Sequence, residues 1–570
     1  MDPNLTHDLD TVVARATPEG EGGLAVVRLS GPQALAIASR VFRGAGYGRG
    51  SGEPGPNPTA PGDSVAPGAG EGSRKGSGPT PRRAVYGIFH EPVDAQHEDP
   101  QALAVIDESL ALWLPGPHSY TGEDTVEFFC HGGRQVTAAV VRACQRAGAV
   151  AAAPGEFTRR AFLNGRLSLD QAEAVADLIQ AGSEQAARAA VAQLRGGLDA
   201  ELGALEWPLL DLLVRLEGSL EFSDDDSDEA VVDAAEIRVV LSEALDGVDQ
   251  LLTLAPAGRL LREGVHVALA GAPNAGKSSL FNRLVGADRA LVDAEPGTTR
   301  DIVTAPVRRG GRLYVFHDTA GLREPAGRVE SMGIARAREA ADQADLVLVL
   351  AALGDGVVVW PEVGGWGDGV AAAGSTCAGA SGGASGGASG GEEAGPTCAG
   401  ASSGATSGAS AADQSGAISG ARPPALFVLT KCDLVSGAGR DGADRATADT
   451  GACAPTCAGA SPHVAIATSS LTGAGVEDLW AAIEHQVAAW RLDEAASLGV
   501  VLNERHRQRL LECRDELAQL LDLYRTEAAP GSEVAGTLLA SLLARLGEIS
   551  GRVFTEQMLD SIFKRFCVGK

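Results

Sequence analysis

A glycine-rich segment combines the residue types that bind a nucleotide phosphate. Residues 271–278 read Gly-Ala-Pro-Asn-Ala-Gly-Lys-Ser, the complete G-x-x-x-x-G-K-[ST] pattern. An apolar run at 265–270 precedes it and a helix-like run at 279–284 follows, which is the strand–loop–helix setting that the pattern needs and that a chance glycine-rich turn would lack. Its backbone N–H groups point at phosphate oxygens, Lys277 adds positive charge, and Ser278 offers a hydroxyl to Mg²⁺.

Two companion segments indicate a GTPase switch. Asp318-Thr-Ala-Gly321 follows the apolar run 313–316 and matches D-x-x-G, whose carboxylate reaches the Mg²⁺ shell and whose glycine N–H senses a γ-phosphate. Between this segment and the phosphate loop lies Gly-Thr-Thr-Arg-Asp at 297–301, and Thr299 is our choice for a second Mg²⁺ ligand.

Two later segments predict that the base is guanine. Thr430-Lys431-Cys-Asp433 follows the apolar run 425–429, and the Asp433 carboxylate accepts hydrogen bonds from two donors that guanine has and adenine lacks. Thr430 stands where Asn is commoner, so we expect this loop to pack less tightly on the phosphate loop. Ser-Ser-Leu at 469–471 fits the last, weaker base-contacting loop.

The five segments together predict a GTP site with Mg²⁺ held by Ser278 and Thr299. Leu322 stands where many small GTPases place a water-orienting Gln, so another group must orient the water. Nearby candidates for that role are Arg323, Glu324 and Glu330. The predicted GTP contacts are Asn274, Ala275, Gly276, Lys277, Ser278, Ser279, Thr298, Thr299, Asp318, Gly321, Thr430, Lys431, Asp433, Ser469, Ser470 and Leu471.

Composition narrows the class of protein. The chain has 570 residues, a net charge of −27 and 44% hydrophobic residues, which suits several globular domains and argues against a surface coated with nucleic-acid-binding charge. The nine cysteines form no C-x-x-C pair, so we expect no zinc site, no disulfide framework and a reducing compartment. Neither a leader sequence nor a membrane-length apolar run is seen, which predicts a cytoplasmic protein.

Three segments look inserted. Residues 46–83 and 364–422 are dominated by small or turn-forming residues, and a third loose segment spans about 436–462. Such compositions bury too little apolar surface to offset ordering entropy, so we expect disordered loops.

The remaining sequence predicts an α/β multidomain fold. Strand-like and helical runs mix in the N-terminal region, and from about residue 168 the pattern becomes helical, with a leucine series that we interpret as one stripe of one long helix: Leu194, Leu198, Leu202, Leu205, Leu209, Leu213, Leu216 and Leu220. Pro208 predicts a kink or break in that helix. Because the helical pattern returns after residue 490, a P-loop GTPase domain with a mixed, doubly wound sheet is inserted in a discontinuous helical bundle.

Further motifs show a resemblance to a known family. They are Asp10-Thr-Val-Val-Ala14, Pro115-Gly-Pro-His-Ser-Tyr-Thr-Gly-Glu-Asp124, His131-Gly-Gly133, Pro154-Gly-Glu-Phe-Thr158, Ala161-Phe-Leu-Asn-Gly-Arg-Leu167, Leu260-Leu-Arg-Glu-Gly264 and the terminal Phe566-Cys-Val-Gly-Lys570. With them the chain closely resembles the MnmE (TrmE) family of tRNA uridine-modification GTPases over almost everything outside the three insertions.

The resemblance implies a domain plan and partners. It implies a tetrahydrofolate-binding α/β domain at 1–165, helical parts at 166–263 and 491–570, and a GTPase domain at 264–490. It also implies a homodimer that works on tRNA with an FAD-dependent partner protein, as a heterotetramer. By the same resemblance, the complex would add a carboxymethylaminomethyl or aminomethyl group to carbon 5 of the wobble uridine. A 5-formyl or 5,10-methylene tetrahydrofolate would supply the one-carbon unit.

By motif position the resemblance also assigns site residues. The implied folate contacts are Arg28, Glu127, Arg166 and Lys570, with Arg166 standing where the family usually has Lys. Cys567 matches a terminal cysteine suspected of a role in modification, and the alternative is a thiol buried near the C-terminus.

The family's dependence on K⁺ and on G-domain dimerisation accounts for the missing Gln. Asn274 and the backbone of the 296–301 loop, including Pro296 and Thr298, would hold K⁺ near the phosphates. Glu330 would orient the water and act with Lys277 and Thr299, the alternative being an exposed glutamate at a helix start.

Two other functions stay open at this stage. One is a ribosome-assembly or translation-associated GTPase that switches on RNA without modification chemistry. The other is a degenerate relative in which the insertions have spoiled dimerisation. An RNA-binding module such as a KH domain would favour the former, and none is evident in the sequence.

Overall fold

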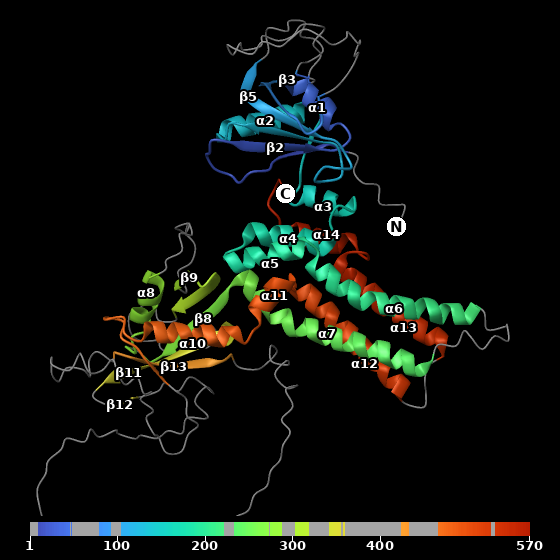
Figure 1. Cartoon of the computed structure of the whole chain (residues 1–570). Helices are drawn as coiled ribbons and strands as arrows, with labels where there is room; N and C mark the ends of the chain where they lie inside the picture. The colour runs from blue at the N-terminus through green and yellow to red at the C-terminus, as the bar shows by residue number, and fades with distance from the viewer. Residues whose placement is uncertain are drawn as a thin grey trace, which may run out of the picture. The chain divides into compact units, whose positions relative to one another are not determined.

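A computed structural model describes most of the chain outside the low-complexity segments. The described residues are 10–45, 47, 79–92, 104–221, 233–272, 274–287, 303–318, 341–354, 357–358, 423–431, 465–525 and 531–569 (Figure 1). They fall into two compact units. Unit 1 contains Met1–Ile179, Gln193–Leu245 and Gln508–Lys570, and unit 2 contains Gln180–Ala192 and Asp246–Arg507.

The N-terminal part of unit 1 is a sheet covered by helices on one face. Its strand order is β3-β4-β5-β6-β2-β1-β7. Helices α1 (Ala34–Val41) and α2 (Arg134–Arg146) cover one face and enclose a core around Val27, Phe89 and Phe128 (Figure 1). The strands are β1 (Val12–Arg15), β2 (Ala25–Ser30), β3 (Phe42–Gly44), β4 (Ala84–His90), β5 (Val105–Leu114), β6 (Thr125–Cys130) and β7 (Val150–Ala151).

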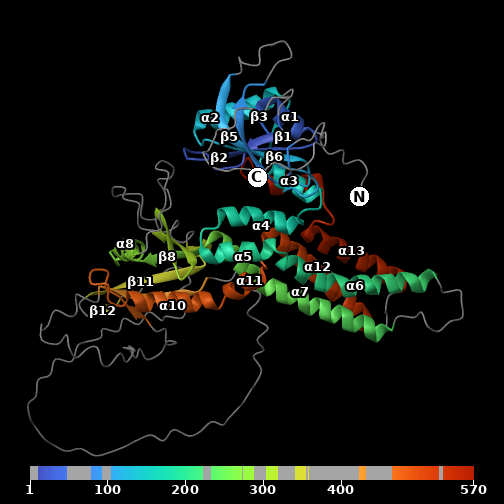
Figure 2. The same cartoon turned by 45° about the horizontal axis from the view of Figure 1, so that its top comes forward.

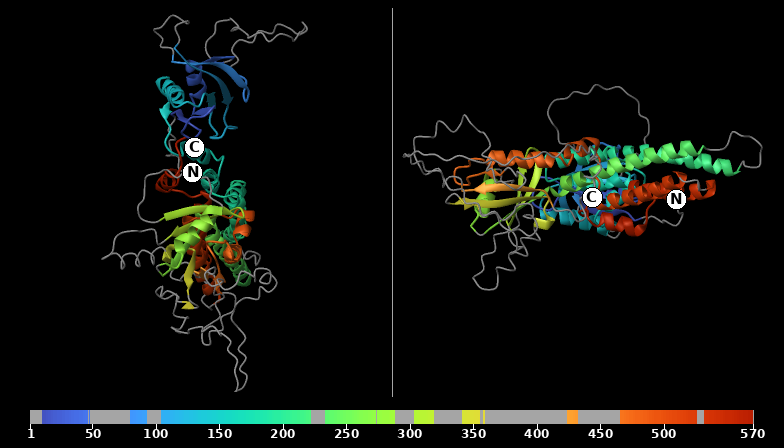
Figure 3. Two further views of the ribbon diagram at one scale, coloured as in Figure 1. Left: turned by 90° about the vertical axis from the view of Figure 1, so that its left-hand side faces the viewer. Right: turned by 90° about the horizontal axis from the view of Figure 1, so that it is seen from below.

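The rest of unit 1 is helical. Long helices lie lengthwise beside one another (Figure 3). Among them α6 contacts α13, where the small Gly536 faces Leu213. The helices with residues in this unit are α3 (Glu156–Leu163), α4 (Leu169–Gln180), α6 (Gly197–Glu221), α7 (Ala234–Glu263), α12 (Glu504–Arg525), α13 (Ser532–Ser550) and α14 (Glu556–Phe563). Residues before 246 in α7 and after 507 in α12 belong to unit 1.

The leucine series does not form one helix. Leu194 ends α5 (Glu184–Leu194), and α6 starts at Gly197 because Gly196 takes a left-handed conformation with φ +92°. The alternative of a break at Pro208 is also wrong, since α6 runs through it. The carbonyl of Ala204, whose helical N–H partner is missing at Pro208, belongs to an exposed residue, so water satisfies it.

Unit 2 is built on a mixed sheet with the order β14-β13-β11-β8-β10-β9, with β12 paired to β11. Neighbours from β14 to β10 run parallel, whereas β9 is antiparallel to β10. The strands are β8 (Val265–Gly271), β9 (Val303–Arg309), β10 (Arg312–Asp318), β11 (Leu346–Gly354), β12 (Val357–Val358), β13 (Ala425–Thr430) and β14 (Ile466–Ala467).

Helical residues cover both faces of this sheet. On one face lies α10 (Val476–Ala488), which runs beside the strands (Figure 2). Its Trp480 packs edge-on against Tyr314 and Phe316. On the other face Ala341 and Ala344 pack against alanines of β8. Helices α8 (Lys277–Ala287) and α11 (Leu492–Leu498) also belong to this unit, as do most of α5 (Glu184–Leu194), the residues of α7 from 246 onward and the first residues of α12. The predicted α/β multidomain class, with a mixed and doubly wound nucleotide-binding sheet, is confirmed.

The predicted insertions lie mostly outside the described residues. Two parts of the first are described. Tyr47 is 2% exposed and packs edge-on against Phe42 in the core, and at 79–83 the Arg82 N–H donates to the Trp113 carbonyl. At these residues the expectation of a disordered loop is wrong, because ring burial and a backbone hydrogen bond hold them in place. Within the described ranges no helix is both long and apolar enough to cross a membrane. The structure divides into two compact units. The predicted division into four parts, with boundaries at residues 165, 263 and 490, stays a prediction.

Candidate functional site

The phosphate-binding loop lies between the last residue of β8 and the first residue of α8. Asn274 and Gly276 take left-handed conformations, with φ +63° and +85°, which curl the backbone between these elements. Gly271 is fixed by a close approach, because a Cβ there would lie 2.6 Å from the Leu350 carbonyl oxygen of the neighbouring strand. The loop therefore has the backbone shape predicted from its glycines.

Lys277 is the buried cation of this loop. Its Nζ donates hydrogen bonds to the carbonyls of Gly271 and Ala272, both at 2.9 Å. Burial lowers the pKa of the Lys277 ammonium, and the nearby Asp318 carboxylate opposes that shift. The loop thus carries a positive charge held on its own carbonyl oxygens, and a phosphate anion would complement that charge.

Of the groups predicted around Mg²⁺, Asp318 and Ser278 are described, and both lie at the same edge of the sheet. Asp318 is the buried last residue of β10, and its charge acts on Lys277. Ser278, in the first turn of α8, is exposed, as are Ser279 and Asn274. A hydroxyl and a carboxylate beside one phosphate loop fit the oxygen-ligand chemistry of Mg²⁺. Among the described residues, no group of three or more His, Cys, Asp or Glu side chains is placed so that it could hold a metal ion.

Thr430 ties the predicted guanine loop directly to the phosphate loop. It ends β13, and its hydroxyl donates to the Ala275 carbonyl at 2.6 Å, with the Ala351 carbonyl at 3.3 Å. The expected loosening of this contact is therefore not found, since the hydroxyl makes a short bond in a fully buried position. Lys431 follows with a left-handed φ of +62°, which turns the chain away from the strand.

The last base-contacting loop is built as a tight turn after β14. Ser469 is buried, its carbonyl accepts from the Gly473 N–H, and its hydroxyl accepts from the Thr472 N–H at 3.2 Å. Ser470 is half-buried and Leu471 is 80% exposed. This loop and β13 are joined because Thr468 donates from both its N–H and its hydroxyl to the Leu429 carbonyl.

Several predicted residues lie outside the described residues, and their roles stay predictions. They are Pro296, Thr298, Thr299, Gly321, Leu322, Arg323, Glu324, Glu330, Asp433 and Lys570.

A second set of predicted residues meets on the N-terminal sheet. Arg28 of β2 and Glu127 of β6 lie opposite each other in the strand register and form an ion pair of 2.8 Å, each 15% exposed. The Arg28 guanidinium lies over two rings, 5.1 Å from the centre of Tyr120 and 5.4 Å from that of Phe157. Sequence reasoning missed both aromatic residues as site components, although each stands inside a motif that it singled out.

Arg166 and Cys567 lie at neighbouring parts of unit 1. Arg166 is exposed, and its Cγ would be 3.3 Å from a Cβ built on Gly122 of the loop that carries Tyr120. Cys567 is exposed, so the alternative of a buried thiol is wrong, and its carbonyl accepts from the Gly155 N–H at the start of α3 at 3.4 Å. The structure thus brings the chain end against the same helix that supplies Phe157.

The Arg28–Glu127 pair fits a folate in its chemistry. A pterin ring offers adjacent donors and acceptors that a carboxylate and a guanidinium match, and folate carries a glutamyl carboxylate that arginine binds well. Two aromatic rings beside the guanidinium add flat apolar surface. The described residues at this place could therefore hold such a group.

Comparisons with known proteins cover almost the whole chain. The family model described as "MnmE helical domain" matches residues 169–567, and that described as "GTP-binding protein TrmE N-terminus" matches residues 11–166. A protein of Moorella thermoacetica named "tRNA modification GTPase MnmE" is 34% identical over 98% of this chain and 99% of its own. One of the same name from Myxococcus xanthus is 36% identical over 99% and 100% of the two chains.

Likeness to solved structures is much weaker. The G domain of the T. maritima FeoB iron transporter covers 40% of this chain and 98% of its own at 19% identity, with a TM-score of 0.19. Such a low TM-score supports no inference about this chain.

Proposed function

The chain belongs to the MnmE family of tRNA modification GTPases, and we propose the chemistry that it performs within that activity. The chain hydrolyses GTP in a K⁺-dependent reaction. Together with an FAD-dependent partner protein it adds a carboxymethylaminomethyl or aminomethyl group to carbon 5 of the wobble uridine in certain tRNAs. GTP hydrolysis in tRNA modification follows from the family, and the ion, the partner and the transferred group are the proposal.

One observation carries the nucleotide part of the proposal. Lys277, Asp318 and Thr430 come from segments that are far apart in sequence, and they converge on one edge of a parallel sheet around a curled loop. Ligands bind at the carboxyl ends of parallel strands, where strand ends and helix N-termini meet. The Lys277 ammonium lies against the loop carbonyls and binds the β- and γ-phosphates of GTP.

We assign the hydrolytic step to groups around this loop. Ser278 and Thr299 hold Mg²⁺, while Asn274, Pro296 and Thr298 hold K⁺, and Glu330 orients the attacking water. The exposed position of Asn274 at the rim of the loop supports its part in this assignment. The two cations, when bound, neutralise charge that develops on the phosphates in the transition state.

We assign the one-carbon donor to unit 1. Arg28, Glu127, Arg166 and Lys570 bind a tetrahydrofolate in its 5-formyl or 5,10-methylene form, and the paired, half-buried Arg28 and Glu127 support this. Cys567 is exposed, and its backbone carbonyl accepts a hydrogen bond at the start of α3. We assign to its thiol a role in the tRNA modification reaction. The active assembly is a cytoplasmic homodimer that joins its FAD-dependent partner as a heterotetramer.

Measurement of GTP turnover by the purified chain tests the proposed dependence of hydrolysis on K⁺. We expect turnover in K⁺ to exceed turnover in Na⁺ by at least about tenfold, since a cation that fits beside the phosphates replaces an arginine finger. Glu330→Ala should abolish the K⁺-stimulated rate, while the control Glu324→Ala keeps it. Equal rates in K⁺ and Na⁺, or ready turnover of ATP, would contradict the proposal.

Mass spectrometry of tRNA nucleosides tests the modification. Cells that lack the gene should lose the modified wobble uridine, and the parent gene should restore it while a Lys277→Ala gene does not. Unchanged wobble uridines would instead favour a ribosome-associated GTPase switch.

A further inference from the structure

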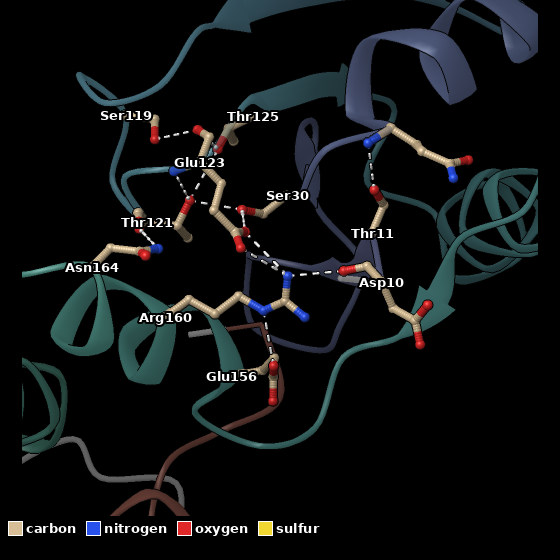
Figure 4. A network of polar contacts seen from close by, with 11 residues as sticks. Asp10, Thr11, Ser30, Ser119, Thr121, Glu123, Thr125, Glu156, Arg160 and Asn164 are labelled. Atoms are coloured by element: carbon tan, nitrogen blue, oxygen red, sulfur yellow. Dashed lines mark hydrogen bonds and ion pairs between the residues drawn. The ribbon is translucent and has the colours of Figure 1, made fainter. Parts of the chain in front are cut away.

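A buried arginine joins three segments beside the proposed folate site. Arg160 of α3 is 5% exposed, and its guanidinium donates to the Glu156 carboxylate at 2.9 Å, to both Glu123 oxygens at 3.1 and 3.2 Å, and to the Asp10 carbonyl at 2.9 Å (Figure 4). Glu156 lies on the same helix, Glu123 on the loop between β5 and β6, and Asp10 before β1. One side chain therefore fixes the helix, the loop and the sheet together.

Glu123 extends this network to the strand that carries Arg28. It accepts from the Ser30 hydroxyl at 2.7 Å, and the same hydroxyl is 2.7 Å from that of Thr121 (Figure 4). Ser30 and Arg28 stand two residues apart on β2, so both side chains point to the same face of the sheet. The Thr121 carbonyl in turn accepts from the Asn164 side chain, just after α3, at 2.8 Å.

The two rings beside Arg28 come from the two segments that Arg160 joins. Tyr120 belongs to the loop, Phe157 belongs to α3, and a hydrogen bond of 2.9 Å between the Tyr120 and Thr158 hydroxyls adds a further contact. The separation of the rings thus depends on how the loop sits on the helix. Arg160, which bonds both, sets that separation.

We propose that Arg160 is a positioning residue for folate binding: by fixing the 115–124 loop on α3 it holds Tyr120 and Phe157 around Arg28. The inference rests on the proposed folate site. Arg160 acts on the fold in this arrangement, because its Nε and Nη1 donate to two carboxylates and a carbonyl of the protein. Its effect on the ligand passes through Arg28.

Arg160→Lys in the full-length protein tests the proposal. Lysine keeps the charge but has a single nitrogen, which cannot span acceptors that the guanidinium fork reaches from Nε and Nη1. We expect calorimetric affinity for 5-formyltetrahydrofolate to fall about tenfold, the size of one coupled interaction, while GTP affinity stays unchanged. The control Arg146→Lys changes an exposed arginine of α2 that also pairs with a glutamate, and it should bind folate normally.

A double variant separates positioning from general destabilisation. In an Arg28→Ala background, Arg160→Lys should produce no further loss of folate affinity, because its route to the ligand is already removed. A full additional loss in that background, or parental affinity of the single variant, would overturn the proposal. If Arg160→Lys does not fold, Glu156→Gln is the alternative variant, because it removes one of the two carboxylate partners with little change of shape. We expect it to lower folate affinity less than Arg160→Lys does, and to have no effect in the Arg28→Ala background.

A spectroscopic measurement keeps this test independent of folate. The chain has five tyrosines, so ¹⁹F spectra of protein labelled with 3-fluorotyrosine are simple, and Tyr120→Phe assigns the signal. Arg160→Lys should shift or broaden the Tyr120 signal and leave that of Tyr314 in unit 2 unchanged. An unmoved Tyr120 signal would refute the positioning role. Absence of folate binding by the parent protein would refute only the proposed folate site.

Discussion

Two buried cations of this chain, Lys277 and Arg160, are held in opposite ways. The Lys277 ammonium donates to two backbone carbonyls at 2.9 Å, and Asp318 acts on it as a nearby charge. The Arg160 guanidinium instead bonds two carboxylates directly and one carbonyl. Carbonyl oxygens stabilise an ammonium without neutralising it, so its charge remains for a phosphate, whereas a guanidinium between carboxylates is neutralised in place and joins elements of the fold.

Arg28 combines features of both arrangements. Like Arg160 it has a glutamate partner, at 2.8 Å, but like a ligand-binding group it lies on a sheet face beside aromatic rings and is 15% exposed. Burial alone therefore does not identify a binding cation. The partner groups decide whether its charge is available to a ligand.

Removal of Lys277 should have the largest effect. We expect Lys277→Ala to weaken GTP binding at least about 100-fold, because hydrogen bonds from a charged donor to two phosphates are lost together. Folate affinity should not change. Titration with a fluorescent GTP analogue measures the first effect, and calorimetry measures the second.

The control is Arg308→Ala, which removes an exposed cation of β9 whose side chain donates to the Gly182 carbonyl. If both variants bound GTP equally well, the carbonyl-held ammonium would not be the phosphate-binding group.

Removal of Arg28 should have the next largest effect. Arg28→Ala deletes a charged partner and leaves Glu127 half-buried without it, so folate affinity should fall about 30-fold, equivalent to roughly 2 kcal/mol. GTP binding should be unaffected. Calorimetry with 5-formyltetrahydrofolate measures the loss, and Arg40→Ala, an N-terminal-domain arginine that donates to the Ala147 carbonyl, is the control. Parental affinity in the Arg28 variant would move the folate site elsewhere.

Asp170 is a buried carboxyl group that, among the described residues, forms no ion pair. Its Oδ1 accepts from the Ser168 hydroxyl, and within the described part of the chain its Oδ2 has no hydrogen-bond partner. Burial raises the pKa of Asp170 from its ordinary value of 3.8 to about 6, against the Ser168 bond that lowers it. The folded protein therefore binds this proton more tightly than the unfolded chain does.

The sign of the pH dependence follows from that shift. The stabilising contribution is complete below pH about 4 and is lost as the pH rises through about 6. Asp170→Asn should therefore raise the free energy of unfolding at pH 7.5 by about 3 kcal/mol and flatten its fall between pH 4 and 6. Urea midpoints of both proteins across this range measure the effect. An equal pH dependence in the two proteins would exclude a buried, protonated Asp170.

Loss of the Thr430 hydroxyl should have the smallest effect. Thr430→Ala removes the bond to the Ala275 carbonyl, worth about 1 kcal/mol, so GTP affinity should fall roughly fivefold. Thr468→Ala is the control, because its hydroxyl bonds the Leu429 carbonyl on the same sheet edge and does not reach the phosphate loop. A larger loss in the control would show that the bond to Ala275 is unimportant.

The predicted strands illustrate what local pattern settles. Three apolar runs of the sequence are strands, as predicted. The run before the phosphate loop is β8, the run that leads to Asp318 is β10, and the run that leads to Thr430 is β13. Buried parallel strands have such continuous apolar sequences. The leucine series shows where local pattern fails. Its spacing of three and four continues across Arg195 and Gly196, but the left-handed glycine ends one helix and lets another begin.

The family, the α/β multidomain class and the phosphate loop can be predicted from residue types, because they depend on motifs with short, fixed spacings. Three contacts become visible only in the folded chain: Arg28 faces Glu127 between two rings, Thr430 bonds the phosphate loop, and Arg160 joins α3 to the 115–124 loop. These partners are far apart along the chain, since Arg28 and Glu127 are separated by 99 residues and Thr430 and Ala275 by 155. Such pairs are selected by strand register and packing, which no local spacing encodes.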